Sequence, residues 1–219
     1  MTSAEMLTYF KERYGASGQT NAGKTDEELY LYLNAAVNYF TNTRYTGNNA
    51  RQASFINDAK RVDDLRTLIK QSADLIDGNA MLFYKNGKSY QLPVDYRFMI
   101  NVFAKPDTDW LPCDVLTPIQ IDPFVESTYN KPVIENPKSF LESNSNLVIL
   151  FDSEENIATA TARMTYIKEP VVIDVDTDCD LPPHTHLEII ELAVLIAVEG
   201  VENMARVQTQ DSIIDKRIE

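Results

Sequence analysis

The stretch Met81-Leu82-Phe83-Tyr84-Lys85-Asn86-Gly87-Lys88-Ser89-Tyr90-Gln91-Leu92 decides the class of fold. Its two apolar and aromatic runs flank an Asn-Gly pair. Asn-Gly in this setting is the strongest short signal of a β-hairpin, because a type I′ turn needs two residues with positive φ. Helical patterns precede residue 78, and strand patterns follow it. We therefore expect an α+β protein with an N-terminal helical part and a central antiparallel sheet.

Two helix starts are visible on the N-terminal side of this hairpin, within residues 1–72. Thr2 with Glu5 and Thr25 with Glu28 each match the capping box, in which the first side chain and the fourth bond each other's backbone amides. Apolar residues recur at helical spacing behind the second box, over residues 29–40. The sequence thus predicts two capped helices in this part of the chain.

A third helix is predicted behind Asn48 or Asn49, and residues 65–69 fit its end or the start of a strand equally well. One apolar face of this helix is expected from four residues, namely Phe55, Ile56, Ala59 and Val62.

Strands are predicted on the C-terminal side of the hairpin at residues 96–103, 147–152, 160–168 and 171–175. Residues 105–146 contain six prolines, which remove backbone donors and favour short strands and an extended loop. We expect three parts: a helical part at 1–77, an antiparallel β region at 78–180, and a C-terminal helix with its tail at 181–219 that packs back on the helical part.

The C-terminal helix, predicted over residues 183–206, is unusually apolar, because ten of the twelve residues 187–198 are apolar. Its glutamates lie close to one stripe, so the helix is expected to be buried on more than one side. Either a partner subunit covers part of it, or it is the central core helix of a monomer. The residues proposed for such an interface or core are Leu187, Ile190, Val194, Leu195 and Val198.

The net charge of −13 is unevenly distributed along the 219 residues. Residues 1–106 carry 13 Lys and Arg against 11 Asp and Glu, whereas residues 107–219 carry 7 against 22. Acidic surfaces repel the phosphates of DNA, so this half is excluded as a DNA-gripping surface but can surround DNA without holding it. The alternative is an acidic surface that only keeps the protein in solution. Two cysteines without CxxC spacing favour a reducing compartment.

Residues 18–25, Gly-Gln-Thr-Asn-Ala-Gly-Lys-Thr, match the P-loop pattern G-x-x-x-x-G-K-[ST]. A P-loop cradles phosphates with its backbone amides, and it requires a buried strand that runs into the loop. The preceding residues 8–14 are charged and helically patterned instead. We interpret the motif as a loop that ends in a helix cap, with a nucleotide-binding enzyme as the alternative. That enzyme would use Gly18, Gly23, Lys24 and Thr25.

Two metal hypotheses arise near residue 180. Alternating aspartates at 174, 176, 178 and 180 resemble the start of a calcium loop, but the sixth place is Cys179 and the twelfth is Thr185, where glycine and glutamate are required. Cys179, His184 and His186 offer three zinc ligands without a fourth, and their position at a helix start suits capping and packing. We therefore expect no metal, no cofactor and no catalytic residue.

The C-terminal half resembles the neck or connector ring proteins of tailed phages, on three successive stretches and one earlier one. These are Met164-Thr165-Tyr166-Ile167-Lys168-Glu169-Pro170, Asp180-Leu181-Pro182-Pro183-His184-Thr185-His186, Leu187-Glu188-Ile189-Ile190-Glu191-Leu192-Ala193-Val194 and Leu92-Pro93-Val94-Asp95-Tyr96. The pattern is most similar to the ring proteins of crAss-like phages, which have a role like that of the head–tail adaptors and tail-tube A proteins of short-tailed phages.

The resemblance implies a bacteriophage virion structural protein without a chemical site. It implies a homo-oligomeric ring, twelvefold by this resemblance, between the portal and neighbouring ring or tail proteins. Genomic DNA would pass through an acidic lumen during ejection, without sequence-specific binding and without a membrane partner. The protein would reside in the neck and tail of the virion, and in the host cytoplasm during assembly. A non-catalytic bacterial adaptor or binding module is the other alternative.

Overall fold

The structure, a computed structural model, describes residues 1–18, 24–47, 59–78, 86–121, 131–133, 135–142, 146–152, 157 and 159–199. The protein is α+β, as the sequence predicted. It divides into two compact units, which we call the helical unit (Met1–Leu68 with Pro170–Glu219) and the strand unit (Ile69–Glu169). The predicted boundaries near 77 and 180 therefore differ from those of the compact units.

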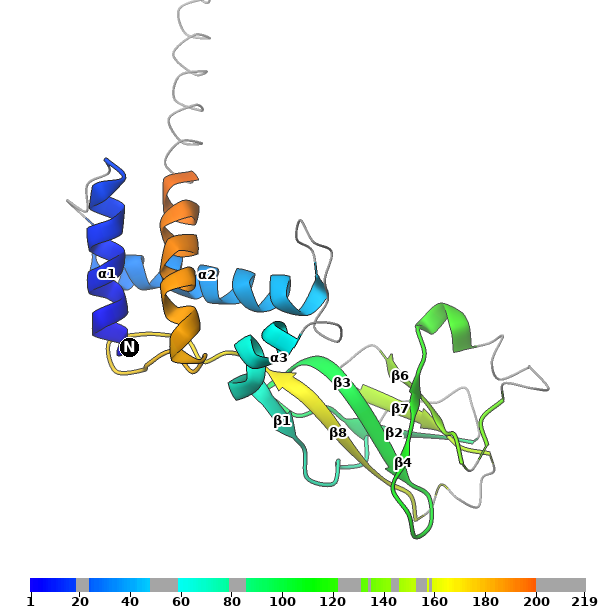
Figure 1. Ribbon diagram of the computed structural model, residues 1–219. Coiled ribbons are helices and arrows are strands. Elements are labelled where there is room, and N and C mark those ends of the chain that lie inside the picture. Colours follow the sequence, from blue (N-terminus) through cyan, green and yellow to red (C-terminus); the bar gives the residue numbers. More distant parts are fainter. Residues whose placement is uncertain are drawn as a thin grey trace, which may run out of the picture. The chain divides into compact units, whose positions relative to one another are not determined.

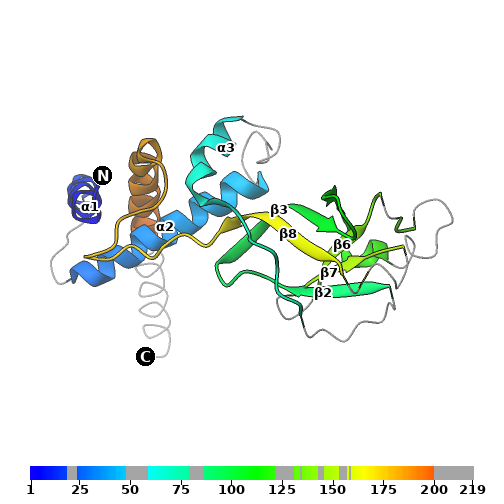
Figure 2. The ribbon, with the colours of Figure 1, turned by 90° about the horizontal axis from the view of Figure 1, so that it is seen from below.

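The helical unit contains α1 (Ser3–Ala16), α2 (Asp26–Thr46), α3 (Ala59–Leu65) and a 3-10 turn, η2 (Arg66–Leu68). A second 3-10 turn, η5 (Pro183–Thr185), leads into a helix at residues 186–199, which we call the terminal helix. The terminal helix lies beside α1, and α2 runs across both (Figure 1, Figure 2). The predicted residues 200–206 of this helix lie outside the described residues.

Both predicted capping boxes are confirmed. The Thr2 hydroxyl accepts the amide of Glu5 at 3.2 Å, and the Glu5 carboxylate accepts the amide of Thr2 at 2.9 Å. Thr25 and Glu28 make the same pair of bonds at the start of α2. α2 ends at Gly47, whose φ of 73° is the left-handed conformation that glycine adopts without a steric penalty.

Large apolar side chains from α1, α2 and the terminal helix form the core of the helical unit. Phe10 stacks on Tyr14 with ring centroids 5.7 Å apart. The fully buried residues of these three helices include Met6, Phe10, Leu29, Leu33, Ala36, Ile189, Ala193 and Ala197. The terminal helix therefore belongs to the same compact unit as α1 and α2.

The predicted buried face of the third helix was wrong where it can be checked. Ala59 and Val62 are exposed, and α3 instead buries Arg61, Asp64 and Leu65. Burial of the two charged residues is tolerated because each has a polar partner; the Arg61 guanidinium, for example, donates to the carbonyl of Thr43 at 3.1 Å. The other predicted residues of this face and its caps, 48–49 and 55–56, lie outside the described residues.

The predicted strand at residues 171–175 was also wrong, since this segment has no ladder partner in the described part of the chain. Asn34 of α2 takes the place of a neighbouring strand. Its amide oxygen accepts the backbone N–H of Ile173 at 2.8 Å, and its amide nitrogen donates to the carbonyl of Ile173 at 2.9 Å. A side-chain amide thus satisfies the backbone groups that the β-branched sequence led us to assign to a sheet.

The strand unit consists of two four-stranded sheets. One has the order β1-β8-β3-β4, with β1 at Ile69–Gln71, β8 at Thr161–Lys168, β3 at Tyr96–Lys105 and β4 at Leu111–Pro112. The other has the order β2-β7-β6-β5, with β2 at Gly87–Gln91, β7 at Asn146–Leu150, β6 at Lys138–Glu142 and β5 at Asp114–Val115. The pairs are antiparallel except β5 with β6, which is parallel.

The strands predicted at 96–103, 147–152 and 160–168 are confirmed, with β3 and β7 shifted by a few residues. The short strands predicted in the proline-rich region are present as β4, β5 and β6, together with a 3-10 turn, η3 (Pro118–Gln120). The first arm of the predicted hairpin, 81–84, lies outside the described residues. Its second arm, β2, pairs with β7 in a register that sets Ser89 opposite Val148.

Two segments join the sheets by crossing from one to the other. The backbone amide of Leu75 donates to the carbonyl of Ala162 in β8 at 2.8 Å. The carbonyl of Ile76, the residue after Leu75, accepts the amide of Gln91 in β2 at 2.8 Å. The second segment is Cys113, which lies between β4 and β5. Its backbone amide donates to the carbonyl of Val102 in β3 at 2.9 Å. Backbone hydrogen bonds therefore run around the unit from one sheet to the other and back.

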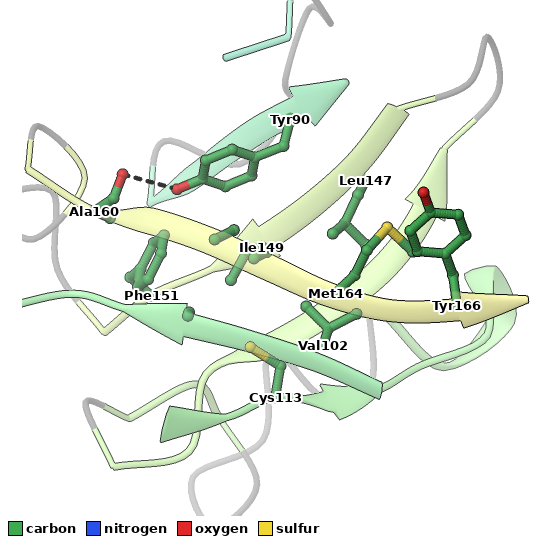
Figure 3. Close-up of a cluster of buried hydrophobic side chains, with 11 residues drawn as sticks. Tyr90, Val102, Cys113, Leu147, Ile149, Phe151, Ala160, Met164 and Tyr166 are labelled. Atoms are coloured by element: carbon green, nitrogen blue, oxygen red, sulfur yellow. Dashed lines mark hydrogen bonds between the residues drawn. The ribbon is translucent and has the colours of Figure 1, made fainter. Parts of the chain in front are cut away.

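The main core of the strand unit lies between these sheets and is drawn in Figure 3. The phenol of Tyr90, fully buried, donates to the carbonyl of Ala160 at 3.0 Å. Apolar residues of both sheets surround it, and they include Val102, Leu147, Ile149, Phe151, Ala162 and Met164. A smaller cluster, formed by Leu116, Ile121, Phe140, Val148 and Leu150, uses the alternate residues of β6 and β7.

Candidate interaction surface

The residues of the P-loop-like motif have other roles in the structure. The helix α1 precedes the motif, in the place where a P-loop requires a strand. Thr25 caps α2 with the hydroxyl that would ligate magnesium. The Lys24 ammonium donates to the Tyr14 hydroxyl at 3.1 Å and lies 4.7 Å and 5.0 Å from the ring centres of Tyr14 and Tyr32.

The environment of Lys24 favours its charged form. Burial lowers the pKa of the ammonium, but the hydrogen bond to Tyr14 and the proximity of Tyr32 outweigh burial, and the pKa is raised. A cation over two aromatic rings is held by their negative faces, so this lysine packs the α1–α2 connection. Gly18 has a φ of 84°, and residues 19–23, including Gly23, lie outside the described residues.

The aspartates that resembled a calcium loop point to backbone partners. The Asp174 carboxylate accepts the amide of Asp176 at 2.9 Å, and this bond lowers the pKa of Asp174. Asp178 accepts the amide of Ser3, at the start of α1, at 2.6 Å. The described residues contain no group of three or more His, Cys, Asp and Glu arranged to hold a metal ion.

The two histidines of the zinc hypothesis likewise have separate partners. His184 Nε2 lies 3.0 Å from the Asp64 carboxylate, while His186 Nε2 lies 2.9 Å from the carbonyl of Leu181. Burial lowers the pKa of His186, and burial raises the pKa of the Cys179 thiol to about 11.

A network of charged side chains connects the last turn of α2 with α3 and the terminal helix. Arg44 Nε lies 2.9 Å from Asp64, which is 1% exposed, and its terminal nitrogen lies 2.5 Å from Glu188. The ring of His184 bonds the other oxygen of the same aspartate. The network connects these elements of the helical unit by the Arg44–Asp64 ion pair and by hydrogen bonds from Arg44 to Glu188 and between His184 and Asp64.

The exposed side of α2 is the most unusual surface of the helical unit. Residues 29–43 include no charged residue over four helical turns, although a surface helix typically carries charges opposite its buried face. Leu31 is 67% exposed and Tyr39 is 55% exposed. We call this surface the α2 outer face, and define it by Leu31, Ala35, Asn38, Tyr39 and Asn42, all of which are exposed.

The residues of the terminal helix that were predicted as interface or core divide into buried and exposed positions. Ile190 is 1% exposed and belongs to the core of the helical unit. Leu187 and Leu195 are 54% and 53% exposed, while Val194 and Val198 are half-buried beside them. We call these four residues, together with the exposed Glu191, the terminal-helix outer face.

Sequence reasoning missed the α2 outer face. Its signal was the uncharged run 29–43, because a helix without charge on any side is typical of burial on two sides. The same signal is plainer in the terminal helix, where ten of the twelve residues 187–198 are apolar. The structure therefore presents two exposed apolar faces on different helices of one unit.

None of the helices among the described residues has the length and the apolar character needed to cross a bilayer. No protein-family model and no curated protein matches the chain.

Proposed function

We propose that this protein is a subunit of a phage neck ring, a virion structural protein that assembles as a homo-oligomer between the portal and the tail. The α2 outer face carries the proposal, because four turns of uncharged exposed helix suit a contact with another protein better than a contact with water. The resemblance to crAss-like ring proteins supports a twelvefold ring.

The two exposed faces support a ring in particular. A ring forms when one surface of a subunit binds a different surface of the next subunit and the rotation closes. Such a subunit needs two unlike contact surfaces, and the helical unit presents the α2 outer face and the terminal-helix outer face.

The charge of the C-terminal half supports the passage of DNA. Residues 169–205 contain no Lys or Arg, and Asp174, Asp176, Glu191 and Glu199 are exposed. A lumen lined by carboxylates repels the DNA backbone, so that DNA moves through without being trapped. In this proposal the acidic segment faces the lumen, and DNA binding is weak at every salt concentration.

Native mass spectrometry and electron microscopy of the purified chain, alone and with the portal protein, test the proposal. We expect rings, and we expect Ala35→Glu to prevent them, because the added charge would be buried in the contact. Thr8→Glu, which adds a charge to the exposed side of α1, is the matched control. A monomer at all concentrations, with no ring on the portal, would refute the proposal.

A further inference from the structure

We propose that the α2 outer face of one copy receives the terminal-helix outer face of the next copy, as the head-to-tail contact of the ring. This inference rests on the proposed function and adds which two surfaces meet. Its occupant is a second copy of this chain, and each copy uses both faces, one on either side.

The two faces match in the spacing of their large side chains. Leu31 and Tyr39 on α2 are eight residues apart, as are Leu187 and Leu195 on the terminal helix. At a rise of about 1.5 Å per residue, each pair spans about 12 Å along its helix. Eight residues also turn both pairs by the same angle about their axes, so the apolar side chains follow similar stripes.

Small and amide side chains complete the α2 side. Ala35 lies midway between the two large residues, which leaves room for a facing helix to approach. Asn38 and Asn42 add amide groups at the edge of the stripe, and an amide N–H can donate to a carboxylate. Glu191, midway between Leu187 and Leu195, is the carboxylate that the α2 outer face must accommodate.

Charge disfavours a symmetric contact between two terminal helices. If two terminal helices met face to face, Glu191 of one copy would lie near the same residue of the other, and like charges in a contact destabilise it. The α2 outer face carries no carboxylate, so Glu191 meets no like charge there, and its carboxylate must keep contact with water at the edge of the interface. Because the two surfaces differ, each contact leaves one of each kind free, and the chain of contacts ends only when a ring closes.

Disulfide trapping with two single variants tests the pairing. Tyr39→Cys and Leu195→Cys are made on a Cys179→Ser background, since Cys113 is buried. We expect a disulfide-linked dimer when the two variants are mixed and oxidised, and none from either variant alone. The same background protein without an added cysteine, and a mixture of Thr8→Cys with Leu195→Cys, are the controls, and neither should give dimers.

Variants without cysteine give an independent reading. Leu195→Glu should weaken self-association by at least about tenfold, whereas Leu195→Met should preserve it, because the contact needs an apolar side chain rather than this particular one. Circular dichroism establishes that each variant is folded, which is expected because Leu195 is half exposed in a single copy.

Two results would overturn the inference. Dimers from Tyr39→Cys alone would mean that α2 meets α2 in a symmetric contact. Rings that give no disulfide in the mixture would mean that other surfaces meet, and this result would leave the proposed function standing. The absence of rings with and without the portal would instead contradict the proposed function.

Discussion

Replacement of Asn34 by alanine should destabilise the helical unit, because this side chain holds residues 170–175 on α2. Its amide makes two hydrogen bonds to the backbone of Ile173, at 2.8 and 2.9 Å, and one to the carbonyl of Tyr30 at 3.0 Å. Ile173 is 1% exposed, so water cannot replace the amide unless the segment moves away.

The expected loss follows from these bonds. A buried backbone group that loses its partner costs about 1–3 kcal/mol, and Asn34→Ala would orphan two such groups. Alanine returns at most about 0.7 kcal/mol through its higher helix propensity. We therefore expect the free energy of unfolding to fall by about 2–4 kcal/mol.

Urea unfolding followed by circular dichroism measures this change, and hydrogen exchange of the Ile173 amide reports the local contact. Glu12→Ala is the control, since it replaces an exposed residue of α1 in the same unit. Asn34→Asp retains the acceptor but not the donor and should fall between wild type and alanine. A loss below about 0.5 kcal/mol, equal to that of the control, would show that the segment does not depend on this amide.

Three further predictions concern the charged network, the buried tyrosines and the P-loop-like motif. Arg44→Met should cost about 3 kcal/mol of unfolding free energy, because it leaves the carboxylate of Asp64 buried without its cation; an unchanged urea midpoint would contradict this. Burial raises the pKa of Tyr166 to about 12, so the folded state keeps a proton that the unfolded chain releases near pH 10. Stability should therefore fall as the pH rises from about 10 towards 12, and tyrosinate absorbance at alkaline pH should reveal a late-titrating group; titration of every tyrosine near 10 would refute it. Calorimetric titration with MgATP and MgGTP should give no heat of binding, and Lys24→Ala should change only stability, by about 1 kcal/mol, through the lost contact with Tyr14. Saturable binding that Lys24→Ala abolishes would restore the enzyme alternative.

Local signals predicted the elements that depend on local chemistry. The capping boxes at Thr2 and Thr25 are bonds between residues three apart, so the sequence contains both partners. The strands β3, β7 and β8 were predicted from short apolar runs in the sequence, whereas the start of β1 was left open. The two hydrogen bonds between the Asn34 side chain and the backbone of Ile173 join residues far apart in the chain, and the sequence around either residue does not predict them.

The candidate surface was only half visible in the sequence. Leu187 and Ile190 belong to the same apolar run, yet one is 54% exposed and the other 1% exposed. Periodicity alone could not separate them, because the distinction depends on which side α1 and α2 cover. The sequence signal of the α2 outer face is an absence, because residues 29–43 contain no charged side chain.

The division of the chain has a consequence for its synthesis. The core of the helical unit needs Ile189 and Ala193, which the ribosome adds only after the complete strand unit. At typical translation rates of about 5–20 residues per second, the terminal helix is synthesised on the order of 10 s after α1 and α2. During that interval their apolar sides are open to chaperones and to other nascent chains. In the proposed ring, a copy can therefore offer the terminal-helix outer face only after the strand unit has been made, and the same helix completes the core of the helical unit.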